Sequence, residues 1–304
     1  MMTADTYQVK IASREYRPEW TWIAQDGADG TLLAVAVWWA SPRGSRPAAL
    51  DGVFVHESVR TADRISLAAG LLSAAHSAYA WAGAARPPDY HVILPGDWRD
   101  QPGAVTALAW RQEAARRAGL TVSVERLSYE WTPLAGLPEL PSRMRFRAEP
   151  DDEVFADLFR RVLAGTLDAA SRTGAAEIGA GAQARRDVAF YREMMAGERS
   201  WWRIAETREG TVIGFGLPSR NTDFPVVGYL GVLPEHRGHG YVGEILAEIT
   251  RVLVAEAGAY VIRADTDLAN LPMADAFERA GYRNFARSLV LSAHRQATGA
   301  TPSA

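Results

Sequence analysis

Residues 226–256 read VVGYLGVLPEHRGHGYVGEILAEITRVLVAE. The run opens with apolar residues, passes Pro234, which cannot donate to a sheet ladder, and reaches a basic turn that contains Gly238 and Gly240. Beyond the turn, apolar residues recur at spacings of three and four from Ile245 to Leu253. The pattern predicts a strand, a tight glycine turn and an amphipathic helix with one buried face.

The turn has the features of an anion-binding site. A helix N-terminus leaves backbone N–H groups without partners and carries partial positive charge. Gly238 and Gly240 lack the side chains that would keep a phosphate away, while Arg237 adds a bidentate cation and His239 a further donor when protonated. We therefore expect this turn to bind a phosphate group.

A second stretch follows in a matching order. Residues 260–267 read as a strand, and residues 270–282, NLPMADAFERAGY, read as a helix that ends in Gly281 and Tyr282. Together with residues 226–256 it resembles motifs A and B of the GCN5-related N-acetyltransferases, the GNAT superfamily. In motif A, a Val-x-Pro strand end leads into RxxGxG or RxxGxA, and in motif B an asparagine is followed seven residues later by an aromatic. The sequence departs from motif A at Val242, where the family has a small residue.

The resemblance implies acetyl-CoA as cosubstrate. In the family the loop amides bind the pyrophosphate, and the pantetheine arm lies between two strands that splay apart. The Val232 amide would then polarise the thioester carbonyl, and Asn270 would contact the arm or its water, which is compatible with a helix N-cap. The residues expected to contact the cofactor are Leu230, Gly231, Val232, Arg237, Gly238, His239, Gly240, Tyr241, Val242, Asn270 and Phe277.

The proton transfers are less determined by the sequence. Phe277 stands where the family usually has a tyrosine that protonates the departing thiolate, and phenylalanine has no proton to give. Tyr282, Tyr260, Tyr229 or water are the alternatives, although tyrosines commonly serve only in packing. The candidate catalytic residues are thus Val232, Tyr282 and Tyr229. For a general base, the acidic residues near strand ends are Glu206, Asp223 and Asp265, and a base acting through ordered water is the alternative.

The first half of the chain repeats this order of elements without the glycine loop. Residues 29–31, DGT, parallel residues 209–211, EGT, and residues 117–120, RAGL, parallel residues 279–282, RAGY. We interpret the parallel as an internal duplication. After its corresponding strand the first half reads FVHESVRTA at 54–62, and without glycine a loop cannot bring a row of amides onto a pyrophosphate. The first half is therefore expected to be a degenerate copy.

The predicted fold class is α/β of the α+β type, with two GNAT-like domains, each a mixed, mostly antiparallel sheet flanked by helices. The predicted ranges are a degenerate domain at 1–132, a proline-rich linker at 133–142, an acetyl-CoA-binding domain at 143–296 and a disordered tail at 297–304. Residues 7–12 are expected to form a strand. The Ala- and Gly-rich residues 168–183 are expected to form a mobile loop, either a substrate lid or a plain surface linker.

Composition limits the possible partners. The net charge of -3 gives no general basic surface for nucleic acid or an anionic membrane. The absence of cysteine excludes disulfides, thiolate metal sites and a cysteine nucleophile, and the 6 histidines are scattered, so no metal is expected. The start of the chain lacks the layout of a signal peptide and no apolar run reaches membrane-spanning length. A soluble, cytoplasmic protein is expected, and the oligomeric state stays open.

The predicted function is N-acetyltransfer from acetyl-CoA to a primary amine of a small molecule or peptide. The amine would attack directly, because no cysteine is present to carry an acyl group. One alternative is a catalytically silent acyl-CoA-binding or sensor protein, motivated by Phe277 and the missing base. The other is an unrelated α/β nucleotide-binding protein.

Overall fold

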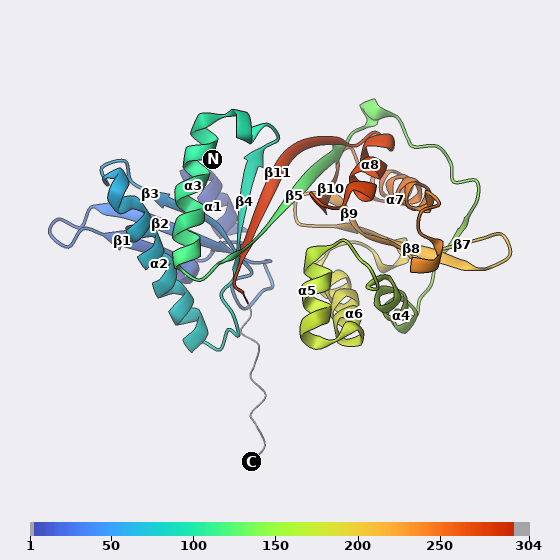
Figure 1. Cartoon of the computed structure of the whole chain (residues 1–304), viewed down its shortest axis with the longest axis horizontal. Helices are drawn as coiled ribbons and strands as arrows, with labels where there is room; N and C mark the ends of the chain where they lie inside the picture. The colour runs from blue at the N-terminus through green and yellow to red at the C-terminus, as the bar shows by residue number, and fades with distance from the viewer. Residues whose placement is uncertain (1–2, 295–304) are drawn as a thin grey trace, which may run out of the picture. The chain divides into compact units, whose positions relative to one another are not determined.

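The computed structural model describes residues 3–294, and the chain divides into two compact units (Figure 1). Unit 1 contains the chain up to Glu125 and again from Ser288, and unit 2 is Arg126–Arg287. Two strands, β5 (Val122–Trp131) and β11 (Arg283–Ser292), contribute residues to both units. The predicted domain ranges stay a prediction, and the predicted tail at 297–304 lies outside the described residues.

Unit 1 is a small sheet covered by helices. Its strands lie in the order β1-β2-β3-β4, with β3 and β4 parallel and the other pairs antiparallel. Its core joins Leu72 of the first long helix to Trp38 and Leu50 of the sheet, and Leu289 and Leu291 of β11 are buried in the same core. The elements are α1 (Ala4–Ala12), η1 (Pro18–Trp20), β1 (Thr21–Gln25), β2 (Leu32–Trp39), β3 (Ala49–Val55), α2 (Thr61–Trp81), β4 (Asp89–Pro95), η2 (Trp98–Asp100) and α3 (Pro102–Arg117).

Unit 2 repeats this order on a larger sheet. Its strands lie in the order β5-β10-β9-β8-β7-β6, and only β9 and β10 are parallel among the pairs with a recorded register. The elements are η3 (Pro133–Ala135), β6 (Arg145–Arg147), α4 (Asp152–Val162), α5 (Ala169–Ile178), α6 (Ala180–Ala189), the π-helical turn η4 (Phe190–Met194), η5 (Arg199–Trp201), β7 (Arg203–Glu206), β8 (Val212–Arg220), β9 (Pro225–Val232), η6 (Pro234–His236), α7 (Tyr241–Ala257), β10 (Ile262–Asp267) and α8 (Leu271–Arg279).

Helices cover both faces of the unit 2 sheet (Figure 1). On one face α7 buries Ile245 and Leu246, with Phe277 of α8 in the same cluster. On the other face α4 buries Phe155 and Phe159. In both units a helix follows the last antiparallel strand, a parallel strand comes next, and a second helix follows. The predicted class, with two similar mixed and mostly antiparallel units, is confirmed.

Two local predictions are wrong. Residues 7–12 belong to α1, because Thr3 caps a helix by accepting a hydrogen bond from the Thr6 amide at 3.1 Å, whereas the alternating apolar residues suggested a strand. Residues 168–183 are not a loop, because they contain all of α5 and the first turn of α6. Asp168 caps α5 through the Ser171 amide at 2.7 Å, and alanine is a strong helix former, so its abundance there favoured helix and not loop.

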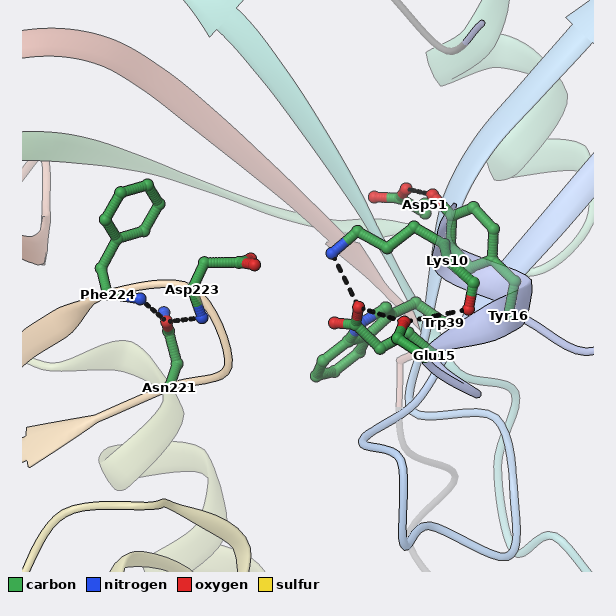
Figure 2. A network of polar contacts seen from close by, with 9 residues as sticks. Lys10, Glu15, Tyr16, Trp39, Asp51, Asn221, Asp223 and Phe224 are labelled. Atoms are coloured by element: carbon green, nitrogen blue, oxygen red, sulfur yellow. Dashed lines mark hydrogen bonds and ion pairs between the residues drawn. The ribbon is translucent and has the colours of Figure 1, made fainter. Parts of the chain in front are cut away.

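A buried glutamate ties the end of α1 to the sheet of unit 1 (Figure 2). Glu15 is 3% exposed and accepts hydrogen bonds from Lys10 at 2.9 Å and from the Trp39 indole at 3.1 Å. Ser13 donates a third hydrogen bond, at 2.8 Å. Within residues 3–294, no helix has the combination of length and apolar character that crossing a bilayer demands.

Candidate functional site

Strands β9 and β10 part soon after they meet. Within the described residues β10 pairs with β9 only at Arg263 and Val226. The Leu233 amide donates to the carbonyl of Ile213 in β8 at 2.9 Å, and successive residues of a strand direct their backbone groups to opposite sides. The N–H and C=O of Val232 therefore point away from β8, to the side where β10 has diverged. A backbone donor thus faces the gap between the strands.

Both glycines of β9 are required by close packing. A Cβ at Gly231 would lie 3.0 Å from Cγ1 of Val162 on α4. One at Gly228 would lie 2.7 Å from the Leu217 carbonyl oxygen and 3.0 Å from the ring of Tyr191, and β8 carries a bulge at Leu217. A glycine inside a strand commonly marks a bulge or the close approach of another group. Here the approaching groups are side chains and backbone of the protein itself.

The turn between η6 and α7 presents free backbone amides. Gly238 and Gly240 have φ of 82° and 76°, a conformation that favours glycine. Among the described residues, the amides from 238 to 242 donate to no backbone or side-chain acceptor. They lie at the start of α7, where the helix dipole is positive. This geometry fits a phosphate group, as the sequence predicted for a loop that includes His239, Tyr241 and Val242.

The side chain of Arg237 is directed away from this turn. Its Nη1 and Nη2 donate to the carbonyls of Ala164 at 2.6 Å and Val162 at 2.7 Å. Its Nε donates to the Val232 carbonyl at 3.1 Å. Arg237 therefore joins the end of α4 to the end of β9, and its contact with a phosphate stays a prediction.

A second arginine, which the sequence analysis missed, lies at the turn. Arg143 Nη1 donates to the His239 carbonyl at 2.9 Å, and Nη2 lies 3.8 Å from where a Cβ of Gly240 would be. The guanidinium lies over the Tyr241 ring, 4.7 Å from its centroid, and pairs with Glu244 of α7. Arg143 precedes His239 by 96 residues, so no local pattern marked it.

The residues predicted on and after α8 fall into two groups. The Asn270 side chain makes no capping hydrogen bond to α8 in the described structure, so its carboxamide is available for other contacts. Phe277 is 2% exposed and stacks on Tyr129, with ring centroids 5.0 Å apart. Tyr282 is 3% exposed, and its hydroxyl shares a hydrogen bond of 2.7 Å with Thr250. Burial raises the pKa of Tyr282, so proton transfer by this residue stays a prediction that the packing does not support.

Tyr229 lies on the other face of β9, against the wall formed by α4 and α6. Its ring is 4.6 Å from that of Phe159 between centroids. Burial raises its pKa, and the nearby Asp168 and Asp187 raise it further. Neither aspartate belongs to a motif in the sequence, and residues 168–183, which include Asp168, were predicted to be a loop.

The predicted general bases are placed as follows. Glu206 pairs with Arg147 at 3.1 Å, and Asp265 accepts a hydrogen bond from the Ser128 hydroxyl at 2.6 Å. The Asp223 amide donates to the Asn221 side chain at 2.9 Å, which holds a turn between β8 and β9 (Figure 2). Within residues 3–294, no group of three or more potential ligand side chains has the geometry to hold a metal ion.

The equivalent strands of unit 1 also part, but a side chain occupies the strand edge. Within the described residues β3 and β4 pair only at Ala49–Asp89 and Leu50–Tyr90. Beyond this point Arg111 Nε donates to the Val53 carbonyl at 3.3 Å. Unit 1 therefore has neither the glycine turn nor an open strand edge at Val53.

Comparisons with known proteins agree with this geometry. Residues 172–282 match the model of the acetyltransferase (GNAT) family. Among solved structures, a tandem GNAT protein from the clavulanic acid biosynthesis pathway has 17% identity and a TM-score of 0.50, covering 95% of this chain and 89% of that chain. A GCN5-related N-acetyltransferase from Sphaerobacter thermophilus has 16% identity and a TM-score of 0.53, covering 87% of this chain and 81% of that chain.

A further similar structure is a glucosamine N-acetyltransferase region of a fungal multi-domain GH3 beta-N-acetylglucosaminidase. It has 16% identity and a TM-score of 0.53, and covers 92% of this chain and 34% of that chain. No curated protein matches the sequence significantly. At these identities the solved structures show the fold alone.

Proposed function

The chain belongs to the GNAT superfamily, and from this premise we propose that unit 2 transfers acetyl from acetyl-CoA to a primary amine of a small molecule or peptide. GNAT membership supports acetyl-CoA-dependent acyl transfer in general. The acceptor class, the direct attack and the residue roles are the proposal.

One observation carries it: β9 and β10 part after Val226, so that the Val232 amide faces the gap next to the free amides of the glycine turn. To bind a phosphate at the turn and a thioester beside Val232, one continuous piece of backbone needs both the free turn amides and the open strand edge. Unit 2 has them within a few residues of each other. A plain strand-to-helix turn would need neither.

The residues then divide by role. The amides from Gly238 to Val242 would hold the pyrophosphate, with Arg143 as a nearby cation. The edge formed by Leu230, Gly231 and Val232 would pair with the pantetheine arm as an added strand. Asn270 would contact the arm. Phe277 would support this site from the core, since it is buried.

Unit 1 is proposed to be the degenerate copy. Arg111 Nε donates to the carbonyl of Val53, on the edge that would otherwise pair with the arm. We expect one acetyl-CoA per chain, bound by unit 2.

Calorimetric titration with acetyl-CoA tests the binding step. Gly238→Asp places a carboxylate at the phosphate position and should weaken binding about tenfold or more, because like charges repel. Gly210→Asp is the matched control: it also has positive φ, at 92° against 82° for Gly238, and a Cβ at either glycine meets nothing within 4 Å. Equal affinities of the two variants would contradict the assignment of the turn.

Turnover separates the proposal from its rivals. Release of free CoA thiol with a panel of primary amines is expected for a transferase. Tight acetyl-CoA binding without consumption of any amine would favour the silent acyl-CoA-binding protein. Stabilisation against heat by ATP but not by CoA would favour the α/β nucleotide-binding protein.

A further inference from the structure

The two carboxylate oxygens of Asp187 on α6 differ, because one accepts a hydrogen bond and the other has no partner among the described residues. Its Oδ1 accepts a hydrogen bond from Gln183 Nε2 at 2.7 Å. Its Oδ2 is buried and has no hydrogen-bond partner among the described residues. A buried acceptor without a partner costs free energy, so a position like this calls for an explanation in terms of a ligand or a proton.

Gln183 holds this carboxylate in a fixed position. The glutamine is 6% exposed, and its Oε1 also lacks a partner in the described part of the chain. It packs so closely on α5 that a Cβ at Gly174 would lie 2.1 Å from Oε1. Gln183 therefore packs against α5 at Gly174, and its hydrogen bond orients the Asp187 carboxylate.

One turn after Asp187, the π-helical turn η4 docks onto β9. The Tyr191 hydroxyl donates to the Gly228 carbonyl at 2.6 Å, and the glycine leaves room for the ring. Single π-helical turns occur frequently at functional sites. Asp187 and Tyr191 thus belong to one segment that is attached to the strand bordering the gap.

Several charged and titratable groups surround this position. The charge of Arg186 on α6 lowers the pKa of Asp187, and the charge of Asp168, the cap of α5, raises it. Burial raises the pKa of Tyr191 and of Tyr229, and the charges of Asp187 and Asp168 raise both further. Arg126 of β5 lowers the pKa of Tyr191. Tyr191 and Tyr229, whose ring centroids lie 6.4 Å apart on the α4–α6 side of β9, are therefore both influenced by the two aspartates.

We propose that Asp187 is the general base of unit 2, and that Oδ2 takes a proton from the ammonium group of the acceptor. This proposal rests on the proposed function. Gln183 is a positioning residue for it. Burial raises the pKa of Asp187 to about 6, while the Gln183 hydrogen bond opposes the rise and Asp168 adds to it. A base is most effective when its pKa is near the working pH.

Asp187 accepts one proton from the acceptor's –NH₃⁺ and leaves –NH₂, whose lone pair attacks the thioester carbonyl carbon. A C–N bond forms and the C–S bond breaks, with its electron pair going to sulfur. The second proton lost from nitrogen ends on the thiolate to give the thiol, and Asp187 returns its own proton to solvent.

The test measures the rate of thiol release between about pH 5 and pH 8, with an amine that the unmodified protein acetylates. Asp187→Asn should lower kcat/KM about 10²–10⁴-fold and remove the acidic limb of the profile. Asp157→Asn, an exposed aspartate on α4 that pairs with Arg160, is the control and should leave both unchanged. Calorimetry should give all three proteins the same affinity for acetyl-CoA.

Gln183→Glu provides a second arm that does not depend on the folding of the Asn variant. Two carboxyl groups in hydrogen-bond contact share a proton, so the acidic limb should move up by about one pH unit or more. An Asp187→Asn protein with full activity, or a limb that stays in place in Gln183→Glu, overturns the assignment while the proposed function stands. Acetyl-CoA binding with no turnover of any amine overturns both.

Discussion

The Nη2 of Arg237 donates to the carbonyl oxygen of Val162, the last residue of α4, at 2.7 Å. The last carbonyls of a helix have no partner within the helix, and a cation there also suits the helix dipole. The same guanidinium holds the Val232 carbonyl at 3.1 Å. A residue that the family resemblance assigns to the cofactor thus also fixes the strand edge on which the cofactor would lie.

Replacing Arg237 by alanine should therefore destabilise the protein even without ligand. Loss of its three hydrogen bonds, two of them part-buried, is expected to lower the free energy of unfolding of unit 2 by about 2–3 kcal/mol, measured by urea denaturation. Arg161→Ala is the control, because Arg161 pairs with the half-exposed Glu235 and such pairs contribute about 0–1 kcal/mol. Similar midpoints for Arg237→Ala and the unmodified protein would contradict the bridging role.

Replacing Gly228 by alanine should displace Tyr191 from β9. The new Cβ would lie 2.7 Å from the Leu217 carbonyl oxygen and 3.0 Å from Cε1 of Tyr191, so one of them has to move. The expected loss is about 1–3 kcal/mol in the free energy of unfolding. Gly243→Ala should do the opposite and stabilise by about 0.5–1 kcal/mol, since Gly243 lies in α7 and its Cβ would meet nothing within 4 Å. Thermal unfolding that ranks the two variants the other way would refute this packing.

The stability of Asp187→Asn should depend on pH relative to the unmodified protein. Burial raises the pKa of Asp187 from 3.8 to about 6, so the fold favours the protonated form. This contribution is fully present below the unfolded pKa of about 3.9 and is lost as pH rises through about 6. The variant, which does not titrate, should melt at a higher temperature than the unmodified protein above pH 6. The difference should close as pH falls toward 4, and a constant difference in melting temperature would contradict the raised pKa.

Glu15 gives a pH dependence of the opposite sign in unit 1. Although burial raises its pKa, the hydrogen bonds from Lys10, Trp39 and Ser13 outweigh burial and hold it below the usual 4.5. Its contribution is present above the unfolded value and is lost as pH falls through the lowered folded value. Glu15→Gln should therefore cost about 1–3 kcal/mol near neutral pH and progressively less in acid.

Glu113→Gln is the control for this effect. Glu113 also has a lowered pKa, to about 2, through Arg116 and Arg117, but it lies at the surface, where ion pairs contribute little. Circular dichroism melts at neutral and acidic pH compare the two variants. Equal shifts would mean that burial of the Glu15 network adds nothing.

Elements whose signals are local could be predicted from the sequence. The strand β9, the turn at Gly238 and Gly240 and the amphipathic helix α7 follow from residues next to each other in the chain: strand-ending Pro234, two positive-φ glycines and a three-to-four apolar spacing. The same holds for the family resemblance, which depends on spacing alone. The sequence also showed that the first half lacks a glycine turn.

Where side chains from distant segments meet depends on the tertiary structure. Arg237 donates to Val162, Arg143 donates to His239, 96 residues away, and Asp187 on α6 raises the pKa of Tyr229 on β9. Leu289 and Leu291 of β11 belong to the core of unit 1, whereas the first residues of the same strand belong to unit 2. Such contacts depend on which faces become buried together, and burial also sets the pKa of Asp187. Neither is encoded in the spacing of neighbouring residues.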